Sequence, residues 1–293
     1  MRQARIKKAE EAYYHVTSRC ALQSFLMGRE EKDMFVKMMR RAEFFSGVHI
    51  ITYCVMDNHF HLLVKVPQRR AVPETELRGR IITLYGEAKA RRIFSRWDSL
   101  EESGDSESAA EEQESFRKRM YDVSEFMKTL KQRYSVWYCS NHKTANEKGE
   151  ERKIEGTIWQ GRFHSVLVEG SQKALTAVAA YIDLNPVRAK IAHDAKAYRW
   201  SGYGAAKRGD NVAKRGHGSI EGALYDDIIK AKQDGLSTRI ASVSRGLAFG
   251  SKRFVTQSIA CADSRRTNTI PLPLAKQGGL SMIFSTVRKK RDA

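Results

Sequence analysis

Two histidines stand one residue apart in the apolar segment CVMDNHFHLLVKVP, residues 54–67. Side chains on a β-strand alternate between its faces, so His59 and His61 are predicted to point to one side and Phe60 to the other. Two imidazoles about 7 Å apart along a strand can close on one metal ion. The same spacing is typical of a solvent-facing strand that binds no metal, so the spacing alone leaves both interpretations open.

A candidate nucleophile lies downstream, in the segment LTAVAAYIDLNPVRAK, residues 175–190. An apolar stripe follows one face of the predicted helix, at Leu175, Val178, Ala179 and Ile182. Tyr181 and Asn185 are four residues apart and therefore share a face at the flank of this stripe. A phenol and a carboxamide placed there can face a groove. Alternatively, Tyr181 packs with its tip in water and Asn185 ends the helix.

Other catalytic motifs are missing from the sequence. It contains no HExxH, no paired-cysteine motif and no GxxxxGK, so a zinc protease, a zinc finger and ATP-driven chemistry are not indicated. Four widely spread cysteines are typical of reduced thiols, which favours a cytoplasmic protein; they are Cys20, Cys54, Cys139 and Cys261.

The charge of the chain favours a polyanionic partner. Lys and Arg number 52 against 34 Asp and Glu, a formal net charge of +18. No apolar run reaches the roughly 18 residues of a membrane span. The N-terminus, MRQARIKKAEEAYYHV, lacks the apolar region of a secretory signal. Nucleic acid is therefore favoured over a membrane.

Strand and helix signals alternate along the first two thirds of the chain. Strands are predicted over 12–20, 49–56, 59–66 and 157–169. Helices are predicted over 30–45, about 74–95, 123–138 and 171–184. Gly47 is expected to end the first helix, Asp57 and Asn58 to form a hairpin turn, and Ser171 to cap the last helix. This order predicts an α+β, ferredoxin-like domain, an antiparallel sheet with helices on one side.

Two polar segments interrupt this pattern. Residues 98–115 are acidic, Ser-rich and almost free of large apolar groups, which predicts a mobile insertion. Residues 141–156 predict a polar loop. We expect one domain over 1–200 and a basic C-terminal extension over 201–293, a candidate for DNA binding. From Arg245 onward the extension has ten Lys or Arg against two Asp.

Three ordered motifs resemble the REP-associated tyrosine transposases, single-tyrosine transposases of the HUH endonuclease superfamily. HFH at 59–61 matches the histidine–hydrophobic–histidine motif, and GTIWQGRFHSVLVEG (156–170) and YIDLNPVRA (181–189) follow it in order. The resemblance covers roughly residues 10–200. It implies the HUH endonuclease form of the fold and a bacterial, cytoplasmic, nucleoid-associated protein.

The resemblance also implies a site. In that family two histidines and an amide side chain one helical turn after the tyrosine hold a divalent metal, which here means His59, His61 and Asn185. The nucleophile position falls on Tyr181. The expected ion is Mg²⁺ or Mn²⁺, and the donor set suits Mn²⁺ better. Attack of the phenol on phosphorus would form a covalent 5′-phosphotyrosine and release a 3′-OH. Rejoining conserves bond energy, so no nucleotide cofactor is expected.

The implied partner is single-stranded DNA, at hairpins of palindromic repeats. Such DNA is gripped by Lys and Arg on phosphates and by aromatic faces on bases. Candidates are Arg162, Trp159 and Arg188, with core packing as the alternative role of Trp159. Self-association stays open.

Three functions fit the sequence to different degrees. The favoured one is a metal-dependent DNA endonuclease and strand-transferase, because all four site residues are present. A catalytically silent DNA-binding protein on the same fold is the second. A metal hydrolase of small molecules is the third, and it matches the positive charge poorly.

Overall fold

A four-stranded antiparallel sheet forms the centre of the computed structural model, which describes residues 10–21, 24–145, 150–154, 156–220, 222–233 and 288–289. Its strands are β1 (Ala12–Arg19), β2 (His49–Val55), β3 (His59–Val66) and β6 (His164–Val168), in the order β2-β3-β1-β6. The first three strands were predicted within one residue at each end. β6 is shorter than the predicted strand over 157–169, of which only Trp159 adds an isolated bridge, to Cys20.

The connections between these strands define the fold. β1 and β2 are joined through α1 (Arg29–Ser46) and have β3 between them in the sheet. The segment from β3 to β6 includes α5 (Val123–Asn141), and β1 lies between those two strands. Every neighbouring pair is antiparallel. Two interleaved βαβ units of this kind make the ferredoxin-like arrangement, so the predicted α+β fold class is confirmed.

One face of the sheet packs on α1 and α5. Side chains that alternate along β1 and β3 point to this side, among them Val16, Phe60 and Leu62, and all three are fully buried. Gly47 ends α1 in the left-handed conformation, with φ of 69°, as predicted for a helix-terminating glycine.

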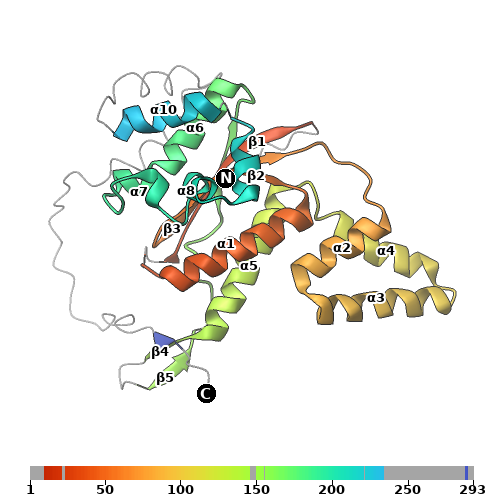
Figure 1. Ribbon diagram of the computed structural model, residues 1–293. Helices are drawn as coiled ribbons and strands as arrows, with labels where there is room; N and C mark the ends of the chain where they lie inside the picture. Colours follow the sequence, from red (N-terminus) through yellow and green to blue (C-terminus); the bar gives the residue numbers. More distant parts are fainter. Residues whose placement is uncertain are drawn as a thin grey trace, which may run out of the picture.

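The opposite face is also covered, so the prediction of helices on one side only is wrong. It packs on α6 (Gln172–Asp183) (Figure 1). Next to it, α8 (Gly202–Lys207) and α9 (Asn211–His217) contact β2, the strand at the edge of the sheet. The physical reason is that β2 and β3 are apolar on both sides, as in a strand buried from two directions.

Short elements complete this second layer. They are α7 (Asn185–Arg188), the 3₁₀ turn η2 (Ala195–Ala197) and α10 (Gly222–Gln233). Residues 201–233 therefore include side chains of the same core, such as Tyr203 and Tyr225. The domain boundary at residue 200 stays a prediction. Most of the basic tail after Arg245 lies outside the described residues.

The prediction of a mobile insertion over 98–115 is wrong. The chain there forms α3 (Glu87–Glu102) and α4 (Ser106–Arg117), which with α2 (Glu74–Tyr85) project to one side of the sheet (Figure 1). Trp97 is fully buried between these helices and contacts Phe116 edge-on at 5.9 Å. These two aromatic residues flank the acidic window and join a hydrophobic cluster built mainly from residues outside it, such as Leu77, Ile81 and Leu84. Asp105 caps α4 by accepting a hydrogen bond from the backbone N–H of Ser108.

The described parts of residues 141–156 also differ from the predicted polar loop. β4 (His142–Ala145) pairs with β5 (Glu151–Lys153) and with β7 (Arg288–Lys289) in a small second sheet. In the parts of the chain that the structure describes, no helix is both long and apolar enough to cross a bilayer.

Candidate active site

The histidine pair lies on β3, on the face that α6 covers. His61 is buried, His59 is half-buried, and their ring centroids are 5.1 Å apart. Phe60 points to the other face and packs against Phe35 at 4.6 Å. The predicted alternation along this strand is confirmed, and Phe60 fixes the strand that carries both imidazoles.

A third imidazole joins the pair. His15 on β1 is buried, and its Nε2 lies 3.0 Å from Nδ1 of His61 in a hydrogen bond. His15 was not among the predicted site residues, because nothing local distinguishes one polar residue on a mostly buried strand. The signal is in the pairing of β1 with β3, where Thr17 stands opposite His61 and places His15 one position along the same face.

Burial favours the neutral imidazole of His15 and of His61. It lowers the pKa of His15 to about 4. The pKa of His61 is well below its ordinary value because the ring is buried, and the positive charges that His15 and His59 would carry, with those of Arg188 and Arg19, add to the effect. A neutral imidazole keeps the lone pair that a metal ligand requires.

Tyr181 reaches the same place from α6. Its ring centroid lies 6.0 Å from that of His61 and 5.9 Å from that of His15. The guanidinium of Arg188 lies over the Tyr181 ring, 4.1 Å from its centroid, and donates a hydrogen bond to the Tyr181 backbone carbonyl. A positive charge at this point stabilises negative charge that develops on a phosphate or a phenolate.

Asn185 begins α7, one turn beyond Tyr181. Its Nδ2 donates to the carbonyls of Tyr181 at 3.2 Å and Ile182 at 3.1 Å. These two hydrogen bonds use the amino group of Asn185. Its carbonyl oxygen, Oδ1, is therefore the atom that could coordinate a metal ion. Pro186 lacks an N–H and is tolerated at the start of a helix, which is consistent with the break between α6 and α7 here.

The side chains fit a divalent metal. Nδ1 of His61 pairs with His15, and Nδ1 of His59 lies 2.6 Å from Oδ1 of Asn58. Each of these hydrogen bonds orients its ring through Nδ1. In many metal-binding histidines one ring nitrogen is held in this way and the other, here Nε2, binds the metal. Among the described residues no group of three His, Cys, Asp or Glu stands at ligand spacing.

A buried carboxylate fixes the helix that carries Tyr181. Asp183 is fully buried and accepts hydrogen bonds from Thr52 Oγ1 at 2.8 Å, the Tyr203 N–H at 3.2 Å and the Tyr225 hydroxyl at 2.5 Å. Thr52 belongs to β2, Tyr203 to α8 and Tyr225 to α10. Asp183 therefore ties α6 to the sheet and to the helices that follow residue 200.

The three predicted DNA-binding residues lie in different surroundings. Arg188 is part of the site and Arg162 is exposed. Trp159 is only 4% exposed, and its ring packs on Phe60 and Tyr134, each with centroids 5.6 Å apart. Trp159 therefore packs in the core, and the prediction that its ring stacks on DNA bases is wrong.

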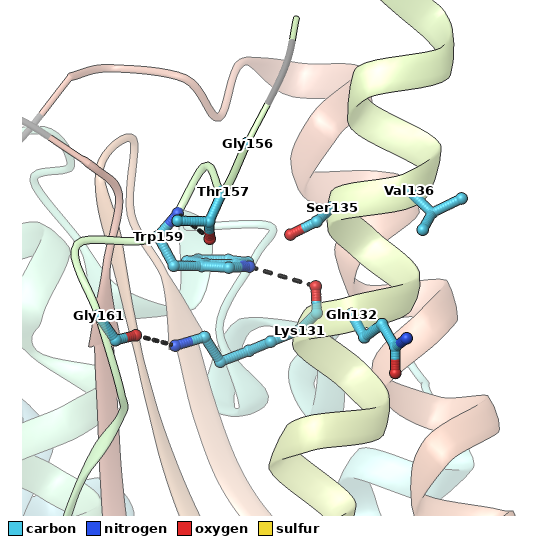
Figure 2. A pocket seen from close by; sticks show the side chains of 8 residues that line it. All are labelled: Lys131, Gln132, Ser135, Val136, Gly156, Thr157, Trp159 and Gly161. Atoms are coloured by element: carbon cyan, nitrogen blue, oxygen red, sulfur yellow. Dashed lines mark hydrogen bonds between the residues drawn. The ribbon is translucent and has the colours of Figure 1, made fainter.

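Trp159 also contributes to the wall of a shallow pocket of about 350 Å³ between α5 and the segment before β6 (Figure 2). There its indole N–H donates to the Lys131 carbonyl at 3.2 Å, and Lys131 Nζ donates to the Gly161 carbonyl at 2.7 Å. Both hydrogen bonds join residues of the protein to one another, and we assign no ligand to this pocket.

Comparison with known proteins supports the same relationship. Residues 8–107 match the family model described as "Transposase IS200 like". The chain is similar to the IS200-like transposases. The match confirms the resemblance seen in the motifs and takes in β1, β2 and β3 with His15, His59 and His61. It spans about a third of the chain, and Tyr181 and Asn185 lie beyond it.

Two further comparisons add little to the IS200-like match. A solved structure, that of a REP-associated tyrosine transposase bound to a REP hairpin, has a TM-score of 0.43 and 13% sequence identity. The alignment covers 70% of this chain and 84% of that one. No curated protein matches the chain.

Proposed function

We propose that the protein is a metal-dependent endonuclease and strand-transferase of single-stranded DNA, acting at hairpins through a 5′-phosphotyrosine. The observation that carries the proposal is the convergence of Tyr181, from α6, with His61 of β3 and His15 of β1, at ring-centroid distances of 6.0 and 5.9 Å. The similarity to IS200-like transposases supports a DNA substrate, as does the net charge of +18.

The residues have distinct tasks in this reaction. His59, His61 and Asn185 would hold a divalent ion, Mg²⁺ or Mn²⁺, which polarises the scissile phosphate when bound. Tyr181 Oη forms the new bond to phosphorus and gives up its proton, while the bond to the 3′ oxygen breaks and that oxygen leaves as a hydroxyl. Arg188 stabilises the negative charge that develops between them. The reverse attack by a 3′-OH rejoins DNA and restores Tyr181, so no nucleotide is consumed.

The test is adduct formation with Tyr181 replaced. Wild-type protein, labelled hairpin DNA drawn from repeats flanking the gene, and Mn²⁺ or Mg²⁺ are expected to give a covalent protein–DNA species on a denaturing gel. Tyr181→Phe removes the nucleophilic oxygen, and we expect the adduct to disappear. Tyr13→Phe is the matched control, since Tyr13 lies on β1 two residues from His15 and its hydroxyl donates to Glu11.

Each other outcome selects a different function. Cleavage that persists unchanged in Tyr181→Phe would mean that water is the nucleophile and would refute the tyrosine mechanism. Binding of several hairpins without an adduct in either metal would favour the catalytically silent DNA-binding protein.

A further inference from the structure

Several cations surround one tyrosine at the junction of the insertion with the core helices. Arg119, after α4, donates from Nη1 to the Tyr85 hydroxyl at 2.6 Å. Arg133 of α5 lies with its guanidinium carbon 5.2 Å from the Tyr85 ring centroid, and Lys89 of α3 with its Nζ at 4.9 Å. Arg41 of α1 is close enough to Arg133 to act on it electrostatically. We call these five residues the Tyr85 cluster.

The Tyr85 cluster lacks the counter-charges that several other cations of the insertion have. In α2 and α3, Arg78 pairs with Glu74 and Asp98, and Arg96 pairs with Glu112. Within the described ranges, none of the four cations of the cluster has an Asp or Glu within salt-bridge distance. Burial, followed by the charges of Arg41 and Arg119, lowers the pKa of Arg133.

Like charges gathered without a carboxylate repel one another, and a bound anion removes that repulsion. Guanidinium groups match phosphate oxygens in geometry. The Tyr85 hydroxyl accepts from Arg119, which leaves its proton for an oxygen of the anion. The arrangement therefore has the donors of a phosphate site: two guanidinium groups beside one phenol, with an exposed ammonium and an exposed third arginine at the rim.

We propose that the Tyr85 cluster binds backbone phosphates of the DNA substrate, outside the cleavage site. The cluster involves α1 and α5, which cover the sheet face opposite to His59 and His61. The folded insertion supplies Tyr85, Lys89 and Arg119, and this gives it a function: it extends the DNA-binding surface of the core. This inference rests on the proposed function for its choice of DNA as the source of the phosphate.

The experiment measures hairpin-DNA affinity against salt concentration by fluorescence anisotropy. The variants are Lys89→Gln, which changes an exposed side chain, and the double variant Lys89→Gln/Arg133→Gln. The matched control is Arg96→Gln, on the same helix α3, because the charge of Arg96 is already neutralised by Glu112 at 2.5 Å. Circular dichroism verifies that each variant is folded.

The expected result is a smaller salt dependence. Each lost phosphate contact lowers the slope of log K against log salt by about 1, so the double variant should lose about 2. Arg96→Gln should bind as wild type does. The rate of adduct formation at saturating DNA should be unchanged in all three variants, because the cluster is separate from Tyr181.

Other outcomes overturn the inference. A wild-type slope in the double variant, or an equal loss in Arg96→Gln, would mean that the cluster makes no specific phosphate contact. Inorganic phosphate that protects Lys89 from acetylation as well as DNA does, at equal ionic strength, would make this a site for small anions and not for DNA. Absence of an adduct in wild-type protein would refute the proposed function, while the comparison of slopes would still test the cluster.

Discussion

Removal of the Asp183 carboxylate is expected to destabilise the protein strongly. In Asp183→Ala the hydroxyls of Thr52 and Tyr225 and the N–H of Tyr203 lose their common acceptor in a fully buried place. A buried polar group left without a partner costs about 1–3 kcal/mol, and the three losses overlap because the hydroxyls can reorient. We therefore expect the free energy of unfolding to fall by about 3–5 kcal/mol, less than the sum of three full and independent losses.

Asp183→Asn is a milder form of the same change. Asn keeps the oxygen that accepts from Thr52 and Tyr203, and its amino group replaces the oxygen that faces the Tyr225 hydroxyl. That hydroxyl can rotate and become an acceptor, so we expect a loss of about 1–2 kcal/mol. Combining Asp183→Asn with Tyr225→Phe should show a coupling of about 0.5–3 kcal/mol, as expected for side chains in direct contact.

The assay is urea unfolding of the full chain, followed by tryptophan fluorescence. The control is Asp33→Asn, whose carboxylate is exposed and accepts from Arg199 at 3.1 Å and Trp200 at 2.8 Å. An exposed pair contributes about 1 kcal/mol or less, so this variant should unfold close to wild type. If Asp183→Ala costs less than Asp33→Asn does, Asp183 does not tie α6 to the sheet and the reasoning is refuted.

Two further predictions concern the insertion and the pocket. Trp97→Ala should lower the free energy of unfolding by about 3–5 kcal/mol, because Trp97 is the largest fully buried side chain of the insertion. Limited proteolysis of this variant should cut first within α3–α4, and resistance equal to that of the wild type would contradict the prediction. Burial lowers the pKa of Lys131 to about 8, so between that pH and its ordinary value the unfolded state holds more protons. Stability should therefore rise with pH through this window in wild type and not in Lys131→Met, as urea midpoints across the pH series will show.

Local patterns were sufficient to predict β1, β2 and β3 and the ends of α1 and α6. The single helix predicted over about 74–95 is wrong, because Gly86, with φ of 81°, separates α2 from α3. Alternation along β1 and β3 is a two-residue signal, and the glycine after α1 and the serine before α6 act within one turn of the helix they delimit. The pairing of His61 with Tyr181 was anticipated only through the resemblance. No local pattern joins residues that are far apart in the chain.

The insertion could not be predicted because its stability comes from outside the acidic window. The window over 98–115 excludes Trp97 by one residue and Phe116 by one residue, and those two rings contact each other. Composition averaged over a segment misses a core that residues outside the segment supply. Trp159 shows the converse error, since an aromatic residue in a basic, Gly-containing stretch is fully compatible with core packing.

His15 and Asp183 suggest what the family motifs leave out. In the sequence, each is an isolated polar residue in an apolar element. Each gains its role from a distant partner: His15 pairs with His61, 46 residues away, and Asp183 with Thr52, 131 residues away. His15 orients the ring of one candidate metal ligand, and Asp183 fixes the helix of the candidate nucleophile. It follows that a chain can retain His59, His61, Tyr181 and Asn185 and still be inactive if either partner is lost. Presence of the four motif residues therefore predicts the chemistry, whereas the buried partners determine whether the residues meet.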